Sequence, residues 1–236
     1  MIPAIETFAT ANAWARACAT RLTDGLTASL KARGRAVFAG SGGSTPKPIY
    51  QVMAETALDW SKIAVTLIDE RYVPETSPDS NARLLKRTLL KGPAAAARFV
   101  PLFHPSITVD RSALIAARDL AAEVGGIDVV LLGMGEDGHI CSMFPGSPTL
   151  ESLLSPHLQP TVLGVPAGRD GAAPSMERLS INLPYLVRAE RVILALTGTA
   201  KRAVFESEAV GDPATRPIAA LIEAGVPLQV LWTETA

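Results

Sequence analysis

Short apolar runs of strand length alternate with longer helical segments along this chain, and this alternation constrains its fold more than any other feature. The runs predicted as strands are residues 35–39, 63–68, 127–132, 191–196 and 228–232. The segments predicted as helices around them are residues 5–31, 44–60, 80–91, 111–124 and 199–210. The alternation predicts an α/β fold of the Rossmann-like kind, with a doubly wound, mostly parallel sheet flanked by helices.

The whole chain, residues 1–236, is expected to form one α/β domain, because α/β folds of this size often fold as one unit. Its 48% hydrophobic content excludes an intrinsically disordered chain. The irregular stretch of residues 145–174 is rich in proline and glycine and is predicted to be a long surface excursion rather than a second domain.

Charge and hydropathy exclude several classes of function. The 22 basic residues are balanced by 23 acidic ones, and no basic block is interleaved with aromatic residues, so nucleic acid is excluded as a partner. No apolar run approaches the roughly 20 residues that span a bilayer, and the first ten residues hold no Lys or Arg. The two cysteines, Cys18 and Cys141, make no disulfide framework. We therefore expect a cytoplasmic protein with reduced thiols and no membrane partner, and the oligomeric state stays open.

A glycine-rich loop follows the strand at residues 35–39, and in open α/β sheets ligands bind beyond such strand ends. The loop contains Gly42, Gly43 and Ser44 and runs into a predicted helix, so its backbone N–H groups would suit a phosphate. It lacks the Gly-Lys-Ser/Thr ending of a P-loop. The alternative interpretation is a simple turn between strand and helix.

Three charged residues, Asp69, Glu70 and Arg71, follow the strand at residues 63–68. A carboxylate and a guanidinium at this position suit the hydroxyls and the phosphate of a sugar phosphate. A surface cluster of ion pairs is the alternative.

The third strand end carries residues 133–139, which match the pattern G-x-G-x-x-G and end in His139. A dinucleotide site requires a helix directly after the glycines, and Pro145 and Pro148 exclude a long one here, so we reject NAD binding. What remains is His139 on a glycine-framed loop, with Asp137 two residues before it. This arrangement suits an exposed general base, and a capping or packing histidine is the alternative.

Two basic residues complete the candidate site. Lys201 follows the strand at residues 191–196 and lies in the first turn of a predicted helix, where a cation opposes the helix dipole and so favours an anionic ligand. Arg178 precedes a predicted strand at residues 179–183, and a solvated side chain is its alternative. His104 and His157 have no clustered partners, and we expect no metal site and no serine triad.

Together these motifs resemble the 6-phosphogluconolactonase family, within the group that also holds glucosamine-6-phosphate deaminase and ribose-5-phosphate isomerase. The resemblance covers nearly the whole chain. It rests on residues 42–46, 69–74, 80–81, 133–146, 178, 197–198, 201 and 227–229.

The resemblance implies the hydrolysis of 6-phospho-D-glucono-1,5-lactone to 6-phosphogluconate in the oxidative pentose phosphate pathway, with no metal or organic cofactor. In that family pattern His139 would be the general base for water, and Asp137 and Asp69 would order the site. The residues that would hold phosphate or stabilise charge are Gly42, Gly43, Ser44, Arg71, Arg178 and Lys201.

Some positions depart from the family pattern. Cys141 stands where a small residue is expected, and residues 168–176 are not diagnostic. A deaminase is the nearest rival, but its loop carries an Asn-Glu-Pro segment where this chain has Ser-Met-Phe-Pro at residues 142–145. A non-catalytic protein that binds a sugar phosphate is the rival from another class.

Overall fold

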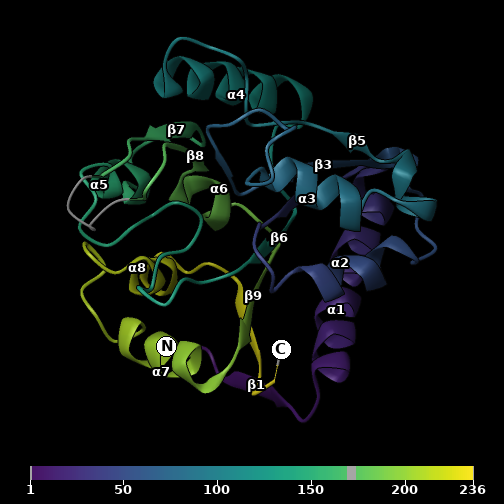
Figure 1. Cartoon of the computed structure of the whole chain (residues 1–236). Helices are drawn as coiled ribbons and strands as arrows, with labels where there is room; N and C mark the ends of the chain where they lie inside the picture. The colour runs from purple at the N-terminus through teal and green to yellow at the C-terminus, as the bar shows by residue number, and fades with distance from the viewer. Residues whose placement is uncertain (1, 169–173, 236) are drawn as a thin grey trace.

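The fold is built on a parallel sheet of seven strands, seen in a computed structural model that describes residues 2–168 and 174–235 (Figure 1). In spatial order the strands are β1 (Ile5–Phe8), β10 (Leu228–Thr233), β9 (Arg191–Thr197), β6 (Val129–Leu132), β2 (Ala36–Gly40), β3 (Ile63–Leu67) and β5 (Arg98–Phe99). Every pair of neighbours is parallel. The prediction of a doubly wound, mostly parallel α/β fold is confirmed.

A second sheet of three short strands lies beside the first. Its strands are β4 (Asp69–Arg71), β8 (Arg178–Ile181) and β7 (Val162–Val165), and both pairings are antiparallel. The stretch of residues 145–174 is thus more regular than the sequence indicated, because it supplies β7 and the short helix α5 (Leu150–Leu154). Residues 169–173 of the same stretch lie outside the described residues.

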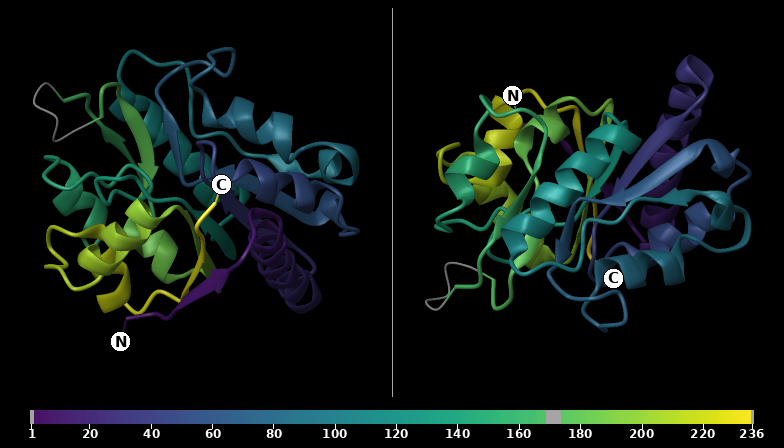
Figure 2. Two further views of the ribbon diagram at one scale, coloured as in Figure 1. Left: turned by 60° about the horizontal axis from the view of Figure 1, so that its bottom comes forward. Right: turned by 90° about the horizontal axis from the view of Figure 1, so that it is seen from above.

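Helices cover both faces of the main sheet (Figure 2). The remaining helices are α1 (Ala11–Arg33), α2 (Lys47–Ala54), α3 (Asn81–Thr88), α4 (Val109–Glu123), α6 (Leu183–Val187), α7 (Thr199–Glu208) and α8 (Pro217–Glu223). Figure 1 shows α1 and α2 on one side of the sheet and α7 and α8 on the other, while α4 packs against β7 and β8 of the small sheet. Two short 3₁₀ turns, Trp60–Lys62 and Gly92–Ala96, complete the chain.

The N-terminal segment differs from its prediction as one continuous helix over residues 5–31. Ile5–Phe8 instead forms an edge strand that pairs with β10, and α1 begins only at Ala11. The Thr10 side chain accepts a hydrogen bond from the Ala13 N–H at 3.2 Å and so caps the helix start, which separates strand from helix. Gly34, with a φ of 70°, ends the helix in the left-handed conformation.

The second predicted helix, residues 44–60, is also shorter than expected. It begins at Lys47 and ends at Ala54, and no side chain caps its N-terminus. The Trp60 indole donates a hydrogen bond to the Thr56 carbonyl at 3.0 Å, which folds the segment after the helix back into a turn.

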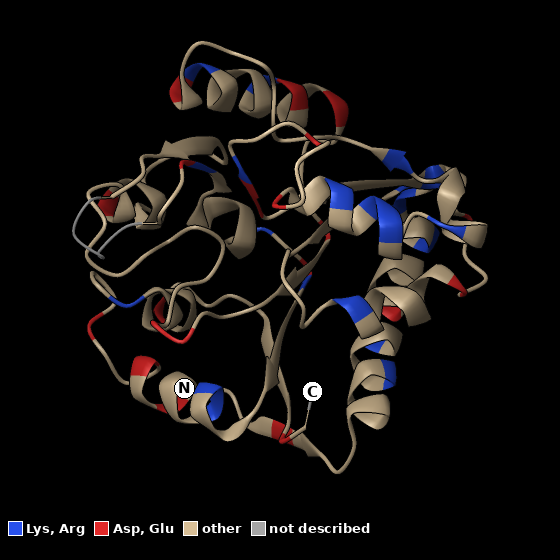
Figure 3. Cartoon of the chain, viewed as in Figure 1, with Lys and Arg blue, Asp and Glu red and all other residues tan. Residues whose placement is uncertain are grey.

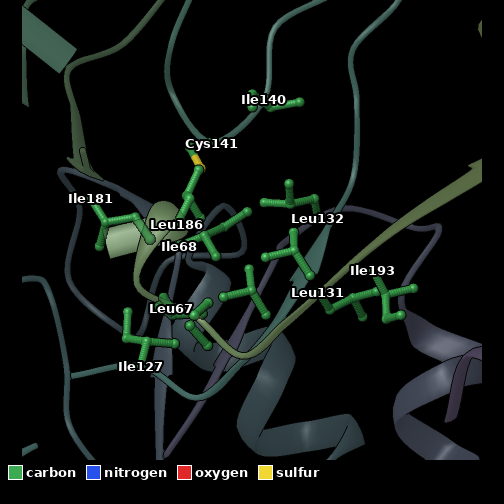
Figure 4. Packing of buried hydrophobic residues seen from close by; sticks show 14 of the residues in the cluster. Leu67, Ile68, Ile127, Leu131, Leu132, Ile140, Cys141, Ile181, Leu186 and Ile193 are labelled. Carbon is green, nitrogen blue, oxygen red and sulfur yellow. The ribbon is translucent and has the colours of Figure 1, made fainter. Parts of the chain in front are cut away.

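The core lies between the central strands and their covering helices. All residues of β2, β3 and β6 are buried, as expected for strands covered on both faces. Figure 4 shows Cys141 together with Ile68, Leu131 and Leu132 in this packing, so the core reaches the loop that carries His139. No helix in the part of the chain that the structure describes is both long and apolar enough to cross a membrane.

Candidate active site

The parallel strands bring their carboxyl ends to one edge of the sheet, where the chain forms a cavity of about 230 Å³. Its walls come from the segments that follow β2, β3, β6 and β9 and from the start of β8. Eight of the nine site residues predicted from the sequence line it: Gly42, Gly43, Ser44, Asp69, Arg71, His139, Arg178 and Lys201. The ninth, Asp137, forms a hydrogen bond with His139.

His139 and Asp137 form a tight pair at this cavity. The His139 Nδ1 lies 2.5 Å from Asp137 Oδ1, and this hydrogen bond lowers the pKa of the Asp137 carboxyl. Because an ionised carboxylate only accepts hydrogen bonds, Nδ1 carries the proton and Nε2 is left as the basic nitrogen. The imidazole also stacks on Phe144, with 4.2 Å between the ring centroids. Its side chain is 27% exposed and thus accessible to water.

Gly135 makes room for this pair. A Cβ atom at this position would lie 2.3 Å from both the Asp137 Oδ1 and the His139 ring, closer than such atoms approach one another. The Gly135 N–H also donates a hydrogen bond to the His139 carbonyl at 2.9 Å, which closes the loop on itself. The glycine pattern of the loop therefore fits the imidazole and carboxylate to each other rather than to a dinucleotide.

Asp69 is buried at the floor of the cavity and held from several sides. Its Oδ2 accepts a hydrogen bond from the Ser142 hydroxyl at 2.7 Å and lies 3.6 Å from Arg178 Nη1. The Asn81 amide donates to the Asp69 carbonyl at 3.0 Å and lies 3.4 Å from Oδ1. The carboxylate is thereby fixed in orientation beside a cation.

Two arginines are neighbours on adjacent strands of the small sheet, because Arg71 of β4 pairs in register with Arg178 of β8. Arg71 donates a hydrogen bond to the Asp79 carbonyl at 2.6 Å. The Nε atoms of both arginines are buried and find no partner among the described residues. Burial lowers the pKa of Arg178, and the nearby Asp69 acts in the opposite direction. The Arg178 guanidinium also lies 5.7 Å from the centroid of the Phe144 ring, on which His139 stacks.

Glu70 does not belong to the cavity, although the sequence places it between two residues that do. Side chains alternate between the faces of a strand, so Glu70 turns away from the side that Asp69 and Arg71 share. It is fully buried at the start of α3. Its carboxylate accepts hydrogen bonds from the backbone N–H groups of Arg71 (2.7 Å), Asn81 (2.8 Å) and Ala82 (2.7 Å) and from the Ser80 hydroxyl (3.0 Å). Burial raises its pKa, and these hydrogen bonds oppose that change.

The glycine loop after β2 approaches α3 closely. A Cβ atom on Gly42 would lie 1.8 Å from the Asn81 Oδ1, so only glycine fits without moving the amide that holds Asp69. Gly43 has a φ of 89°, in the region that favours glycine. The loop leads into α2, whose first N–H groups lack a side-chain cap. The backbone here is thus suited to an anion.

Lys201 enters the cavity from α7 on the far side of the sheet. Gly198, with a φ of 83°, turns the chain from β9 into the helix, and no side chain caps the helix start. Lys201 forms no ion pair within the described residues. The cavity therefore combines three cations with one buried carboxylate and one imidazole.

The sequence analysis gave no role in the site to several residues that shape this cavity, although they lie within the motifs that carry the resemblance. Ser142 and Asn81 hold Asp69, and Phe144 contacts both His139 and Arg178. Ser142 and Asn81 are 73 and 12 positions from Asp69 in the chain, so their local sequence gave no signal of these contacts. Cys141 lines the cavity with a buried thiol and a φ of 51°, an uncommon conformation for a residue with a side chain.

The other histidines lie outside this site. His104 Nε2 is 3.7 Å from Asp119, a residue of α4, and His157 lies near the end of α5. In residues 2–168 and 174–235, no three side chains of His, Cys, Asp or Glu group as metal ligands would.

Comparison with known proteins identifies the family. The family model described as glucosamine-6-phosphate isomerases/6-phosphogluconolactonase matches residues 9–232. Proteins named 6-phosphogluconolactonase from Caulobacter vibrioides and Rhizobium meliloti are 40% and 42% identical to this chain, over 98% and 95% of its length and 97% and 96% of theirs. The crystal structure of a 6-phosphogluconolactonase from Shewanella baltica superposes with a TM-score of 0.89 at 32% identity, covering 99% of each chain. A monomeric glucosamine-6-phosphate deaminase at 18% identity shares the fold. The chain belongs to the glucosamine-6-phosphate isomerase/6-phosphogluconolactonase family.

Proposed function

We propose that this protein hydrolyses 6-phospho-D-glucono-1,5-lactone to 6-phospho-D-gluconate, with His139 as the general base. The names of its relatives support the lactonase activity. The observation that carries the residue assignment is the His139–Asp137 pair, which lies at a cavity lined by three cations. A phosphorylated lactone supplies both a dianion for those cations and a carbonyl for attack by water.

The reaction requires a proton acceptor that works near neutral pH. His139 Nε2 takes a proton from water as the water oxygen forms a bond to the lactone carbonyl carbon. The tetrahedral intermediate then breaks its bond to the ring oxygen, and the imidazolium returns the proton to that oxygen. The products are a carboxylic acid, which ionises, and a free hydroxyl. Asp137 holds the imidazole and stabilises its charged form.

The cations divide between the two ends of the substrate. Arg178 shares the Phe144 ring with His139, and we assign it to the negative charge that develops on the carbonyl oxygen. Asp69 orients Arg178 from 3.6 Å. Lys201, Arg71 and the glycine loop would hold the phosphate.

A deaminase is the second candidate from the same family. Its ring-opening step would require a carboxylate in the loop after the histidine, and the corresponding residues 142–145 of this chain, Ser-Met-Phe-Pro, contain none. The residue directly before Pro145 is Phe144, whose ring stacks on His139 and lies under the Arg178 guanidinium, so an aromatic ring takes the place that a catalytic glutamate would need. We therefore prefer the lactonase.

A pH-stat assay with freshly generated 6-phosphogluconolactone, corrected for spontaneous hydrolysis, tests the proposal. We expect enzyme-dependent acid release from the lactone and no ammonia release from glucosamine 6-phosphate. Isothermal titration with 6-phosphogluconate separates the enzyme from a non-catalytic sugar-phosphate binder, which would bind without any turnover. Ammonia release, or binding without lactone hydrolysis, would overturn the proposed function.

The role of Lys201 has its own test. Hydrogen bonds to charged groups contribute roughly 1.5 to 3 kcal/mol, so Lys201→Ala should weaken inhibition by 6-phosphogluconate about ten- to a hundredfold. The slow hydrolysis of unphosphorylated gluconolactone should hardly change. If Lys201→Ala lowered hydrolysis of the phosphorylated and the unphosphorylated lactone equally, Lys201 would act at the reacting carbonyl instead of the phosphate.

A further inference from the structure

A second hollow, of about 450 Å³, lies between the start of α2 and the length of α3. Four cations line it: Lys47 of α2, Arg83 and Arg87 of α3, and Lys91 just beyond α3. We call these four residues and the hollow between them the basic groove. Lys47, Arg87 and Lys91 are exposed and Arg83 is half-buried, so solutes can reach the charged groups.

The cations of the basic groove lack neutralising partners. None of the four forms an ion pair within the described residues, and the one partner of the Arg83 guanidinium there is the Thr76 carbonyl, to which it donates at 2.7 Å. Lys86, on the same helix but outside the groove, is paired with Glu75 at 2.7 Å. The chain as a whole is balanced, with 22 basic and 23 acidic residues, so the cluster does not follow from a basic composition.

This spacing of like charges disfavours the fold locally. Arg83 and Arg87 are four residues apart on α3 and therefore neighbours on the helix surface, where like charges repel each other. No acidic residue occurs in α3 to offset the repulsion. An arrangement that opposes folding and has no internal partner points to an external anion.

The basic groove and the active-site cavity draw on the same two segments of the chain. Thr45 lines the cavity and Lys47 lines the groove two residues later, while Asn81 and Arg83 stand in the same relation on α3. Figure 3 shows blue segments recurring along α3 and at the start of α2. An anion held in the groove is thus bound by the same two segments, around the starts of α2 and α3, that contribute residues to the cavity.

We propose that the basic groove is a second anion-binding site, which captures phosphate-bearing lactone and raises its local concentration at the active-site cavity. The choice of the lactone as ligand rests on the proposed function, whereas the binding of a phosphate monoester by the groove does not. Charged groups around a site can raise association rates by factors of about 10 to 10³, and the gain falls steeply with salt. The groove would act in this way without touching the reacting atoms.

The first test measures binding without turnover. Inorganic phosphate and 6-phosphogluconate are titrated separately into the protein at low ionic strength, and the amide NMR signals of α3 and Lys47 are followed. We expect saturable shifts with both probes in the wild type and their loss in an Arg87→Glu/Lys91→Glu double variant. Shifts confined to the glycine loop and Lys201, or shifts that persist in the variant, would overturn the proposal.

The second test measures kinetics against a matched control. The Lys31→Glu/Arg111→Glu double variant makes the same change in net charge at exposed residues of α1 and α4 that form no ion pair in the described structure. Lys31 also matches Arg87, because each lies in the last turn of its helix. At an ionic strength of about 10 mM, the groove variant should lower kcat/KM for the phosphorylated lactone about tenfold with kcat retained, and the control less than twofold.

Salt and substrate charge complete the design. The difference between the two variants should disappear at about 0.5 M ionic strength, where the Debye length is only a few ångströms. It should be absent at any salt concentration with unphosphorylated gluconolactone. Equal losses in the control variant, or a loss that survives high salt, would overturn the proposal. A wild type that binds phosphate in the groove but hydrolyses no lactone would instead contradict the proposed function.

Discussion

At the scale of single residues, the proposed chemistry depends on one imidazole and the group that holds it. His139→Ala should lower lactone hydrolysis about 10²- to 10⁴-fold, the usual contribution of general acid–base catalysis. The variant should remain folded, because the His139 side chain is partly exposed and outside the core. Initial rates in the pH-stat assay, with circular dichroism as the control for folding, check this outcome. Wild-type turnover in the folded variant would remove His139 from the mechanism.

Gly135 provides a finer test at the same scale. In Gly135→Ala the new methyl group would overlap Asp137 Oδ1 and the His139 ring, so the two side chains must move apart. Since these are movable side-chain atoms, the fold should survive while hydrolysis falls at least about tenfold through loss of orientation.

Gly126→Ala is the matched control for this substitution. A Cβ atom at Gly126 would have no neighbour within 4 Å, and the loop there lies before β6 rather than after it. Its kcat/KM should equal that of the wild type. If Gly135→Ala were equally active, the closeness of the imidazole and carboxylate would not matter for catalysis.

At the scale of elements, α3 is attached to the site by a buried carboxylate. Glu70→Gln keeps the size of the side chain but replaces one carboxylate oxygen with an NH₂ group, which faces either the N–H groups of Arg71 and Asn81 or the Ala82 N–H and the Ser80 hydroxyl. Leaving buried donors unsatisfied costs about 1 to 3 kcal/mol each, so urea unfolding should show a loss of roughly 2 to 4 kcal/mol.

Glu75→Gln is the control for this element. Glu75 is 47% exposed and pairs with Lys86 on the surface of the same helix. Exposed pairs contribute up to about 1 kcal/mol, so the midpoint of urea unfolding should move little. Equal effects of the two substitutions would show that α3 is held by surface charge rather than by its buried anchor.

The elements also show what the sequence could predict and what it could not. The strands β2, β3, β6 and β9 could be predicted from their apolar runs, because strands buried on both faces are apolar throughout. The edge strand β1 was missed, because four half-exposed residues before a capped helix carry no such run. The pairing of β4 with β8 was missed as well, since it joins residues more than 100 positions apart.

The same distinction holds for the site residues. Except for Arg178, each predicted member follows a strand of the main sheet, and strand direction brings such residues to one edge of a parallel sheet. Arg178 reaches the same edge from the antiparallel small sheet, through the pairing of β8 with β4. The supports of Asp69 could not be found in this way. Asn81 and Ser142 are common polar residues whose role comes from the approach of α3 and of the His139 loop to β4. Glu70 is the reverse case. Its position between Asp69 and Arg71 suggested a place in the site, but side chains alternate along β4, so Glu70 points away from the cavity.

At the scale of the whole molecule, the fold supplies positive charge to the cavity without a bound ion. Arg71 and Arg178 come from the small sheet, and Lys201 comes from a helix on the main sheet, so the two sheets contribute cations to one cavity. A divalent cation placed there would be repelled by these three side chains. The buried Asp69 carboxylate already lies beside Arg178 and accepts a hydrogen bond from Ser142.

This arrangement predicts that catalysis is independent of metal. Exhaustive chelation with EDTA, followed by gel filtration into metal-free buffer, should leave kcat and KM for the lactone unchanged. The physical reason is that the guanidinium and ammonium groups of the cavity would meet both the developing oxyanion and the phosphate in the proposed reaction, while hydrolytic metal sites require three or more protein ligands around an open position. A loss of activity that added zinc restores would contradict the prediction. The zinc would then need a ligand set of another kind, because residues 2–168 and 174–235 hold no group of three His, Cys, Asp or Glu side chains that could bind it.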